Sequence, residues 1–309
     1  MISLRSHAIS LAAVFLALAV GVVLGSGLFA DTVLSGLRND KAELRTEIET
    51  LTDEKNELNE KLSAAGEFDA LMAPRMLRDT LRGTSVMMFR TPDAADDDVE
   101  AVNRMVAQGG GRVAGTIILT PQFVDANSSE KLLSVVNSPI VPVGRQLATT
   151  SVDQGSQAGD LLGIAVLSGK DPAVPDDQRD VVLQTLRDTG FITYDGQIGA
   201  ADTAVIITGG SLGDDAGNRG ATVARFAAAL APHGGGTVLA GRDGSATGTA
   251  AVAVARSDAA LSNAVTTVDD IGAESGRITT ALALSDLLRG SQPGRYGIGQ
   301  GATSVTVPQ

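Results

Sequence analysis

An uncharged stretch near the N-terminus constrains the fold of this chain more than any other feature. The 22 residues at 8–29 contain no charged side chain, whereas Arg5 precedes them and Asp31 follows them. A helix of that length covers the roughly 30 Å hydrocarbon core of a bilayer. The positive charge in front of it places the N-terminus in the cytoplasm. We therefore predict a cytoplasmic stub (1–7), one membrane-spanning helix (8–30) and an extracytoplasmic remainder.

A cleaved secretory signal is the alternative interpretation of this stretch. Signal peptides usually have an apolar region of about 7–15 residues, which is shorter than this one. Cleavage after Ala30 would also need a small residue two positions earlier, where the chain has Leu28. The sequence thus favours a helix that is retained as an anchor.

Small residues recur every four positions within the predicted span. They are Ala13, Ala17, Gly21 and Gly25, and this spacing places them on one face of a helix. Small side chains let two membrane helices approach closely, as in the G-x-x-x-G pattern. Because membrane helices are generally rich in glycine and alanine, this pattern supports pairing only together with the segment that follows.

A heptad repeat follows in residues 31–66. Between Leu34 and Leu62, leucine holds every d position, and lysine interrupts the apolar a positions. The apolar members are Leu34, Leu37, Leu44, Ile48, Leu51, Leu58 and Leu62. This pattern favours a parallel two-stranded coiled coil, so we predict a homodimer held by these residues together with Ala17, Gly21 and Gly25. The alternative, a single amphipathic helix lying on the body, would show a wider apolar stripe.

The rest of the chain, residues 84–309, is expected to form an extracytoplasmic α/β domain behind a linker at 67–83. Gly66 and Pro74 are expected to end the coiled coil. Short apolar runs then alternate with helix-like segments, which predicts a Rossmann-like, mainly parallel sheet covered by helices. The predicted strands are 85–89, 113–119, 161–167, 191–194, 204–207 and 237–239, and the predicted helices are 93–107, 176–186 and 220–230.

A weak internal repeat runs through this body. Residues 85–119 and 204–239 share the order strand, helix, three consecutive glycines, strand. The body is therefore either one domain or two similar halves, 84–170 and 171–309. Helices closed by glycine before a strand are common in α/β folds, so both interpretations stay open.

The chain offers few residues for catalysis. It contains no cysteine and two histidines, His7 and His233. His7 lies at the edge of the predicted span, and His233 stands in a Pro-His-Gly turn, where we expect a solvated side chain. A Ser-His-Asp hydrolase is therefore disfavoured, and we predict a non-enzyme without a cofactor.

One glycine-rich loop is a candidate for binding a ligand. Gly209, Gly210 and Ser211 follow a predicted strand and precede a predicted helix, the position of phosphate-binding loops in α/β folds. Asp214 and Asp215 come next and no lysine is present, which disfavours nucleotides. The alternative is a purely structural turn.

Acidic runs and methionines are the remaining candidates for binding ions. The acids at 96–98 lack the spacing of a calcium loop and suit the start of a helix. Thioethers bind Cu(I), but Met72 and Met76 flank Pro74, and the adjacent residues 87–88 point to opposite faces of a strand. We therefore expect the methionines to fill the core.

The charge balance disfavours nucleic acid as a partner. The net charge is −12, and residues 84–309 contain no cluster of lysine and arginine. A surface that binds phosphate backbones needs the opposite sign.

Several long stretches resemble the actinobacterial copper transport protein B family, most strongly its mycobacterial members. They are MISLRSHAISLAAVFLALAVGVVLGSG, FRTPDAADDDVEAV, VDQGSQAGDLLGIA, GFITY, RFAAALAPHGGGTVLAGRDGSA, TVDDIGAESGRIT and GRYGIGQGA. The resemblance runs from Met1 to the C-terminus. It implies copper efflux and copper resistance, through a pore or as an accessory component, in the cell envelope or outer membrane.

The resemblance also implies an alternative function. A corynebacterial branch of the family resembles an anchored coiled-coil scaffold that binds a second envelope protein and restrains cell-wall hydrolysis at division. The residues themselves indicate one membrane helix and a soluble body, whereas transport calls for a pore. In the tail, Arg295 and Gln300 flank Tyr296, where the family has histidines, so the tail lacks imidazole ligands.

Overall fold

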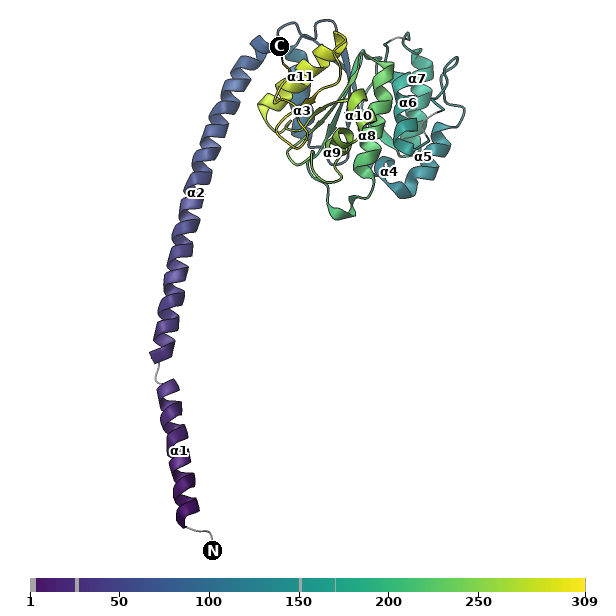
Figure 1. The fold of residues 1–309 in the computed structure, drawn as a ribbon. Helices are drawn as coiled ribbons and strands as arrows, with labels where there is room; N and C mark the ends of the chain where they lie inside the picture. The colour runs from purple at the N-terminus through teal and green to yellow at the C-terminus, as the bar shows by residue number, and fades with distance from the viewer. Residues whose placement is uncertain (1–3, 26–27, 150–151, 170, 309) are drawn as a thin grey trace. The chain divides into compact units, whose positions relative to one another are not determined.

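The computed structural model describes residues 4–25, 28–149, 152–169 and 171–308. The chain divides into two compact units, Met1–Ala65 and Gly66–Gln309. The first unit is helical, and the second is an α/β body (Figure 1).

Helix α1 (Leu4–Gly25) supplies the apolar segment of the first unit. Its side chains from Arg5 to Val23 are exposed, and by length and composition this helix could cross a membrane, a test that signal sequences also pass. The predicted span at 8–30 falls on α1 and on the first residues of α2 (Leu28–Met76), and residues 26–27 lie outside the described residues.

Helix α2 (Leu28–Met76) is 49 residues long and corrects two expectations. Gly66 and Pro74 do not end it, because the helix continues through both to Met76. The predicted linker at 67–83 is also wrong. Its first part is helical, and Ala73, Leu77 and Leu81 are buried in the core of the body. Pro74 is exposed on this helix, so water can satisfy the backbone carbonyl that lacks a proline N–H partner.

The body is built on one seven-stranded sheet with the order β3-β2-β1-β4-β5-β6-β7. The strands are β1 (Ser85–Arg90), β2 (Arg112–Leu119), β3 (Ile192–Tyr194), β4 (Thr203–Thr208), β5 (Thr237–Gly241), β6 (Thr266–Val268) and β7 (Arg295–Tyr296). Every pairing is parallel except that of β3 with β2. The predicted α/β fold with a mainly parallel sheet is confirmed, while β6 and β7 are additions to the predicted strands.

Helices cover both faces of the sheet. One face packs against α3 (Asp96–Gln108), α11 (Glu274–Leu288) and the end of α2. Figure 1 shows α3 and α11 on one side and α6, α8, α9 and α10 on the other. The second face carries α4 (Pro121–Val124), α5 (Ser129–Val136), α6 (Gln154–Val166), α7 (Asp176–Asp188), α8 (Arg219–Leu230), α9 (Ala251–Ser257) and α10 (Ala259–Ala264). Three single 3-10 turns, η1 (Ala126–Ser128), η2 (Asp214–Ala216) and η3 (Ala231–His233), complete the described elements.

Alternating side chains of each central strand pack into these two cores. Met87 and Phe89 of β1 lie in the core beneath α6 and α8, whereas Val86 and Met88 lie in the core beneath α3 and α11. The prediction that Met87 and Met88 point to opposite faces is therefore confirmed.

Helix α6 replaces the strand predicted at 161–167, which is wrong. Nearly all its residues are buried, so the apolar run lacks the periodicity of an amphipathic helix. Gly155, Gly159 and Gly163 recur every four residues on one side of α6, where the first two meet α8 and the third meets His233 of η3. A Cβ on Gly159 would lie 2.5 Å from the backbone oxygen of Phe226. The glycines thus let two helix backbones approach closely, and this packing decides the helical conformation.

The repeated sequence pattern corresponds to two crossovers that leave the middle of the sheet in opposite directions. β1-α3-β2 runs toward β3, and β4-α8-β5 runs toward β7. The helix of the first crossover covers one face and the helix of the second covers the other. This arrangement creates a topological switch point between β1 and β4.

Candidate functional site

A cavity opens at the carboxyl ends of the strands, beside the switch point. It has a volume of about 630 Å³ and lies among the loops after β1, β2 and β4 and the beginnings of α8 and α9. Binding sites in open α/β sheets occur at this location and have volumes of about 300–1,000 Å³. Its polar wall is formed by Asp93, Gln122, Asp125, Ser128, Thr208 and Arg219, and its apolar wall includes Val124, Leu212 and Val223.

The predicted ligand loop lies next to this cavity without forming its wall. The cavity is lined by Thr208 and Leu212, which flank Gly209, Gly210 and Ser211. The N–H of Gly209 donates to Asp93 Oδ2 over 3.1 Å, and a Cβ on Gly210 would lie 2.6 Å from the backbone oxygen of Asp243. These glycines therefore allow neighbouring loops to pack closely. This is the role expected if the segment is a structural turn.

The polar groups of the cavity are partly engaged within the protein. Asp93 also accepts hydrogen bonds from Thr91 Oγ1 at 2.5 Å and Thr208 Oγ1 at 3.3 Å. Asp125 accepts from the N–H of Asn127. Arg219 begins α8 at the rim. Because carboxylates share the wall with a single arginine, the cavity suits a small neutral or zwitterionic molecule better than a phosphate.

His233 is tied to α6, contrary to the expected solvated turn. Its Nε2 lies 2.7 Å from Asp160 Oδ1, and its side chain is largely buried. Asp160 Oδ2 also accepts the N–H of Ala148 at 2.6 Å. The adjoining cavity has a volume of only about 20 Å³, which is too small for a substrate. Asp160 therefore links helix α6 both to His233 of η3 and to the loop that contains Ala148.

A buried carboxylate, Asp98, joins two arginines on the α3 and α11 side. Asp98 is fully buried, and Arg242 contacts it through Nε and through Nη2, the latter at 3.1 Å. Arg277 Nη2 lies 3.5 Å from the same carboxylate. The hydrogen bond that Arg242 donates to Asp98 raises the pKa of Arg242 above its ordinary value. The acid run at 96–98 does begin a helix, but its third member works as a tertiary contact.

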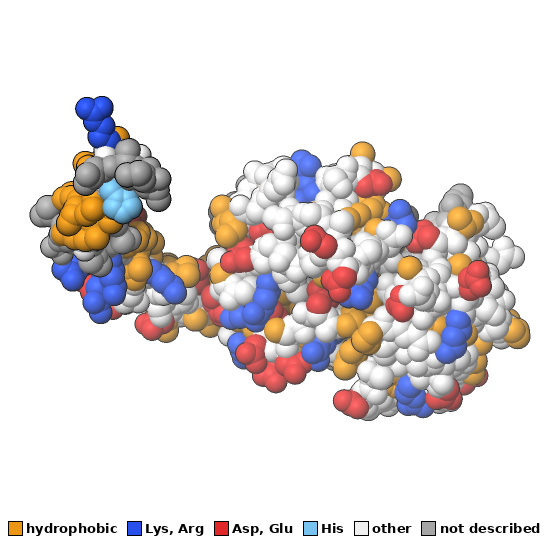
Figure 2. All heavy atoms as spheres, turned by 90° about the horizontal axis from the view of Figure 1, so that it is seen from below, with side chains coloured by type: hydrophobic (Ala, Val, Ile, Leu, Met, Phe, Trp, Pro, Cys, Tyr) orange, Lys and Arg blue, Asp and Glu red, His pale blue; other side chains and the backbone are white. Residues whose placement is uncertain are grey.

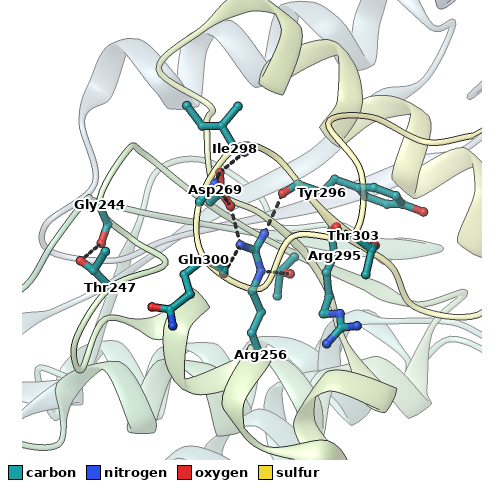
Figure 3. Close-up of polar contacts among 11 residues, drawn as sticks. Gly244, Thr247, Arg256, Asp269, Arg295, Tyr296, Ile298, Gln300 and Thr303 are labelled. Carbon is teal, nitrogen blue, oxygen red and sulfur yellow. Dashed lines mark hydrogen bonds and ion pairs between the residues drawn. The ribbon is translucent and has the colours of Figure 1, made fainter.

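The C-terminal tail closes over a second buried ion pair. Figure 3 shows Arg256 pointing from α9 toward Asp269, with the backbone of the tail around its guanidinium group. Arg256 Nη2 donates to the Tyr296 carbonyl at 2.7 Å, and Nη1 donates to the Gln300 carbonyl at 3.0 Å. Asp269 Oδ1 accepts the N–H of Ile298 at 2.8 Å. The Arg256–Asp269 ion pair therefore fixes the GRYGIGQGA segment through hydrogen bonds to its backbone.

Asp270, the neighbour of this pair, is buried in an acidic environment. Desolvation, with further contributions from Asp269 and Asp243, raises its pKa to about 6. Its Oδ1 is buried without a hydrogen-bond partner among the described residues. A neutral, protonated carboxyl group is the form that such an environment favours.

No group of three or more His, Asp and Glu side chains in the described part of the chain is arranged to hold a metal ion. The described histidine of the body is paired with Asp160, and the tail at Arg295 and Gln300 supplies backbone contacts and no imidazole. The Asp98–Arg242 pair joins residues 144 apart in the chain and the Arg256–Asp269 pair joins residues 13 apart, and neither separation corresponds to a helix or strand period that the sequence pattern could show.

The residues predicted for dimerisation lie on exposed helix faces. Leu44, Ile48, Leu51, Leu58 and Leu62 are between 56% and 67% exposed. Ala17, Gly21 and Gly25 are exposed on α1. The side chains of Leu34 and Leu37 lie outside the described residues. Large exposed leucines at heptad spacing mark a surface suited to a partner.

Charged side chains of both signs are interspersed over the face of the body in Figure 2. Several of the body's charges are matched within the protein, as in Arg145 with Asp171 and Arg90 with Asp96. The face drawn in Figure 2 therefore has no extended patch of one sign.

Comparison with known proteins defines the family. The model of the family described as "Copper transport outer membrane protein, MctB" matches residues 1–307. The chain is 62% identical over 314 residues to "Copper transporter MctB" of Mycobacterium tuberculosis (strain ATCC 25618 / H37Rv), with all of both chains covered. It is 63% identical over 317 residues to "Copper transporter MctB" of Mycobacterium leprae (strain TN), again over the full length of both. With a match that extends through the apolar segment, the long helix and the body alike, the chain belongs to the MctB family of copper transport outer membrane proteins.

Proposed function

We propose that this protein takes part in copper transport across the cell envelope. The observation that carries the proposal is 62% identity over the whole chain to proteins named copper transporters. At this identity the body, the long helix and the apolar segment are all shared, so the role does not depend on one isolated motif.

The proposed arrangement is a dimer anchored by α1, with its bodies outside the cytoplasm. The exposed leucines of α2 support the pairing, because five large apolar side chains at heptad spacing would otherwise face water. The position of Arg5 before the apolar segment supports the orientation. A second envelope protein is a further proposed partner.

The body acts in this proposal as an accessory component and not as the conduit. Both faces of its sheet carry packed apolar cores, and α1 is the single helix in the described residues that is long and apolar enough to cross a membrane. A packed sheet interior leaves no polar path for an ion. Conduction would therefore require several anchors or a partner protein.

A deletion strain tests the proposed function. We expect it to accumulate copper and to grow poorly on copper, and we expect the full chain to restore both properties. A matched control expresses residues 66–309 behind a cleavable signal. It supplies the body without α1 and without the heptad repeat of α2, here called the seam (residues 34–62), and it is expected not to restore export. Unchanged copper content in the deletion strain would contradict the proposal, and a division defect with normal copper content would favour the scaffold function instead.

A further inference from the structure

Two of the described methionines lie outside the cores. Met87, Met88 and Met105 are at most 1% exposed and fill the two cores of the body. Met76, in contrast, is 46% exposed, and Met72 is half-buried. Core packing accounts for the first three, so the thioethers on α2 need another explanation.

Both residues continue the heptad seam of α2. Because the helix runs without interruption from Leu28 to Met76, the register set by the leucines extends past Gly66. Seven-residue steps lead from Leu58 through Ala65 to Met72 at d, and from Leu62 through Asp69 to Met76 at a. The methionines are therefore the last d and a residues of the helix.

The body leaves this part of the seam uncovered. Ala73 and Leu77 are the fully buried residues at the end of α2 and just after it, and they occupy the e and b positions. At 3.6 residues per turn, the midpoint of these two positions lies about 100° around the helix from the middle of the seam. The body therefore packs on the flank of α2, and the a and d residues stay available to a second copy. Met76 also borders a groove of about 400 Å³ beside α11, and the residue as a whole is 46% exposed.

Pairing would bring four thioethers together. In a parallel coiled coil, a and d residues face their counterparts across the axis, and residues four apart on one helix have Cβ atoms about 5–6 Å apart. Two copies of Met72 and Met76 would therefore surround the axis within one helical turn. Thioether sulphur is a soft ligand that selects Cu(I).

The neighbouring layer of the seam favours a cation. Asp69 holds the a position three residues before Met72, so two carboxylates would meet across the axis next to the sulphur atoms. Two like charges at this distance repel each other, and a bound cation would offset the repulsion. An all-leucine seam would not contain this feature.

We propose that the last two heptads of α2 form a Cu(I) site at the dimer axis, with Met72 and Met76 of both copies as ligands and one ion per dimer. This inference rests on the proposed dimer and deepens the proposed copper function by assigning the ligands. The site lies at the C-terminal end of α2, next to Ala73 and Leu77, which are buried in the body.

Cu(I) titration of the full-length protein in detergent tests the site. The ion is supplied anaerobically with ascorbate and a chromogenic Cu(I) chelator as competitor. We expect one Cu(I) per two chains, with sulphur as the nearest neighbour in X-ray absorption spectra. Leucine suits both seam positions, so Met72→Leu/Met76→Leu should remain dimeric and lose affinity at least about 100-fold, whereas Met105→Leu, a core control, should bind like the wild type.

Several outcomes would overturn the site. These are a dimer that binds no Cu(I), equal affinity in the double variant, nitrogen or oxygen as the nearest neighbour, or a monomeric wild-type protein. Copper content of the deletion strain is measured separately. If that strain accumulates copper while the purified dimer binds no Cu(I), the assigned ligands are wrong and the proposed transport function stands.

Discussion

The long helix α2 and the α/β body use apolar residues in opposite ways. In the body, leucines such as Leu161 and Leu162 are fully buried by other parts of the same chain. On α2, Leu44, Leu51 and Leu58 are more than half exposed. The first unit therefore carries an apolar surface that is not buried within that unit, which is typical of surfaces that bind a partner. We therefore expect the stability of the body and the proposed association of the helix to be separable properties.

The largest expected effect is on the proposed dimerisation of α2. Leu44→Lys/Leu51→Lys/Leu58→Lys removes three d residues, each worth about 1.5–3 kcal/mol of apolar burial. We expect the dissociation constant of the dimer to rise at least about 1,000-fold, with the unfolding temperature of the body unchanged. Analytical ultracentrifugation in detergent gives the mass.

A control with the same change in charge is available off the seam. Glu43→Gln/Glu49→Gln/Glu60→Gln lies at the c, b and f positions and should stay dimeric. An unchanged mass for the lysine variant, or a body that unfolds at a lower temperature with it, would break the separation between helix and body.

The second prediction concerns packing within the body. Gly159→Ala places a Cβ against the backbone of α8, and overpacking of this kind costs about 3 kcal/mol when the backbone must move. We expect a loss of roughly 6–12 °C in unfolding temperature without a change in dimer mass, measured by calorimetry and ultracentrifugation. Wild-type stability of the variant would show that α6 and α8 are packed loosely enough to admit a methyl group.

The third prediction concerns pH. The pKa of Asp270 is about 6 in the folded protein, above its ordinary value of 3.8, so the folded state binds more protons than the unfolded state between these values. Stability should therefore fall as pH rises from about 4 to 6 and remain lower above that range. Asp270→Asn should remove this decline and be more stable than the wild type at pH 8 by up to about 3 kcal/mol.

Chemical denaturation of the body across pH 4–8 measures the effect of Asp270. Asp188→Asn, at an exposed site on α7, should retain the wild-type decline. A parallel decline in Asp270→Asn would show that another group is responsible.

The fourth prediction concerns Asp98. Asp98→Ala leaves Arg242 and Arg277 without their shared carboxylate. Because Arg242 is 43% exposed, water can solvate much of the released charge, so we expect a cost of about 1–2 kcal/mol, below that of a fully buried pair. Denaturation of the body measures it, and a cost above that of Gly159→Ala would show that water does not relieve the two released charges.

The smallest effect sharpens the comparison on α2. A Cβ on Gly66 would meet nothing within 4 Å, and alanine favours a helix over glycine by up to about 1 kcal/mol. Gly66→Ala should therefore raise helicity and tighten the dimer slightly, as followed by circular dichroism. A loss of helicity would indicate that Gly66 is a break in solution.

Much of the fold follows from local patterns of residues. The strands β1, β2, β4 and β5 and the helices α3, α7 and α8 lie within a few residues of their predicted positions, because each has its own periodicity and flanking glycines. The prediction for α6 is wrong, since a helix buried on all sides shows no amphipathic period. The short strands β6 and β7 escape prediction because two or three residues carry too little pattern.

The candidate sites are much harder to predict. The predicted loop 209–211 does lie at the correct edge of the sheet, but its glycines contact Asp93 and Asp243 and leave the cavity to their neighbours. The prediction that Met72 and Met76 fill the core is wrong. Pro74 does not break the helix between them. The continuous helix instead places both methionines at a and d positions of the heptad pattern.

The sequence by itself determined the apolar N-terminal helix, the heptad surface and the mainly parallel α/β body, because each is encoded by spacing within a short window. Tertiary structure alone decided which partners the charges take. Asp98 meets Arg242 across 144 residues, and Arg256 holds the Gln300 carbonyl across 44. Contacts of this range depend on strand order and on which face a helix covers, and no local period of residues specifies either.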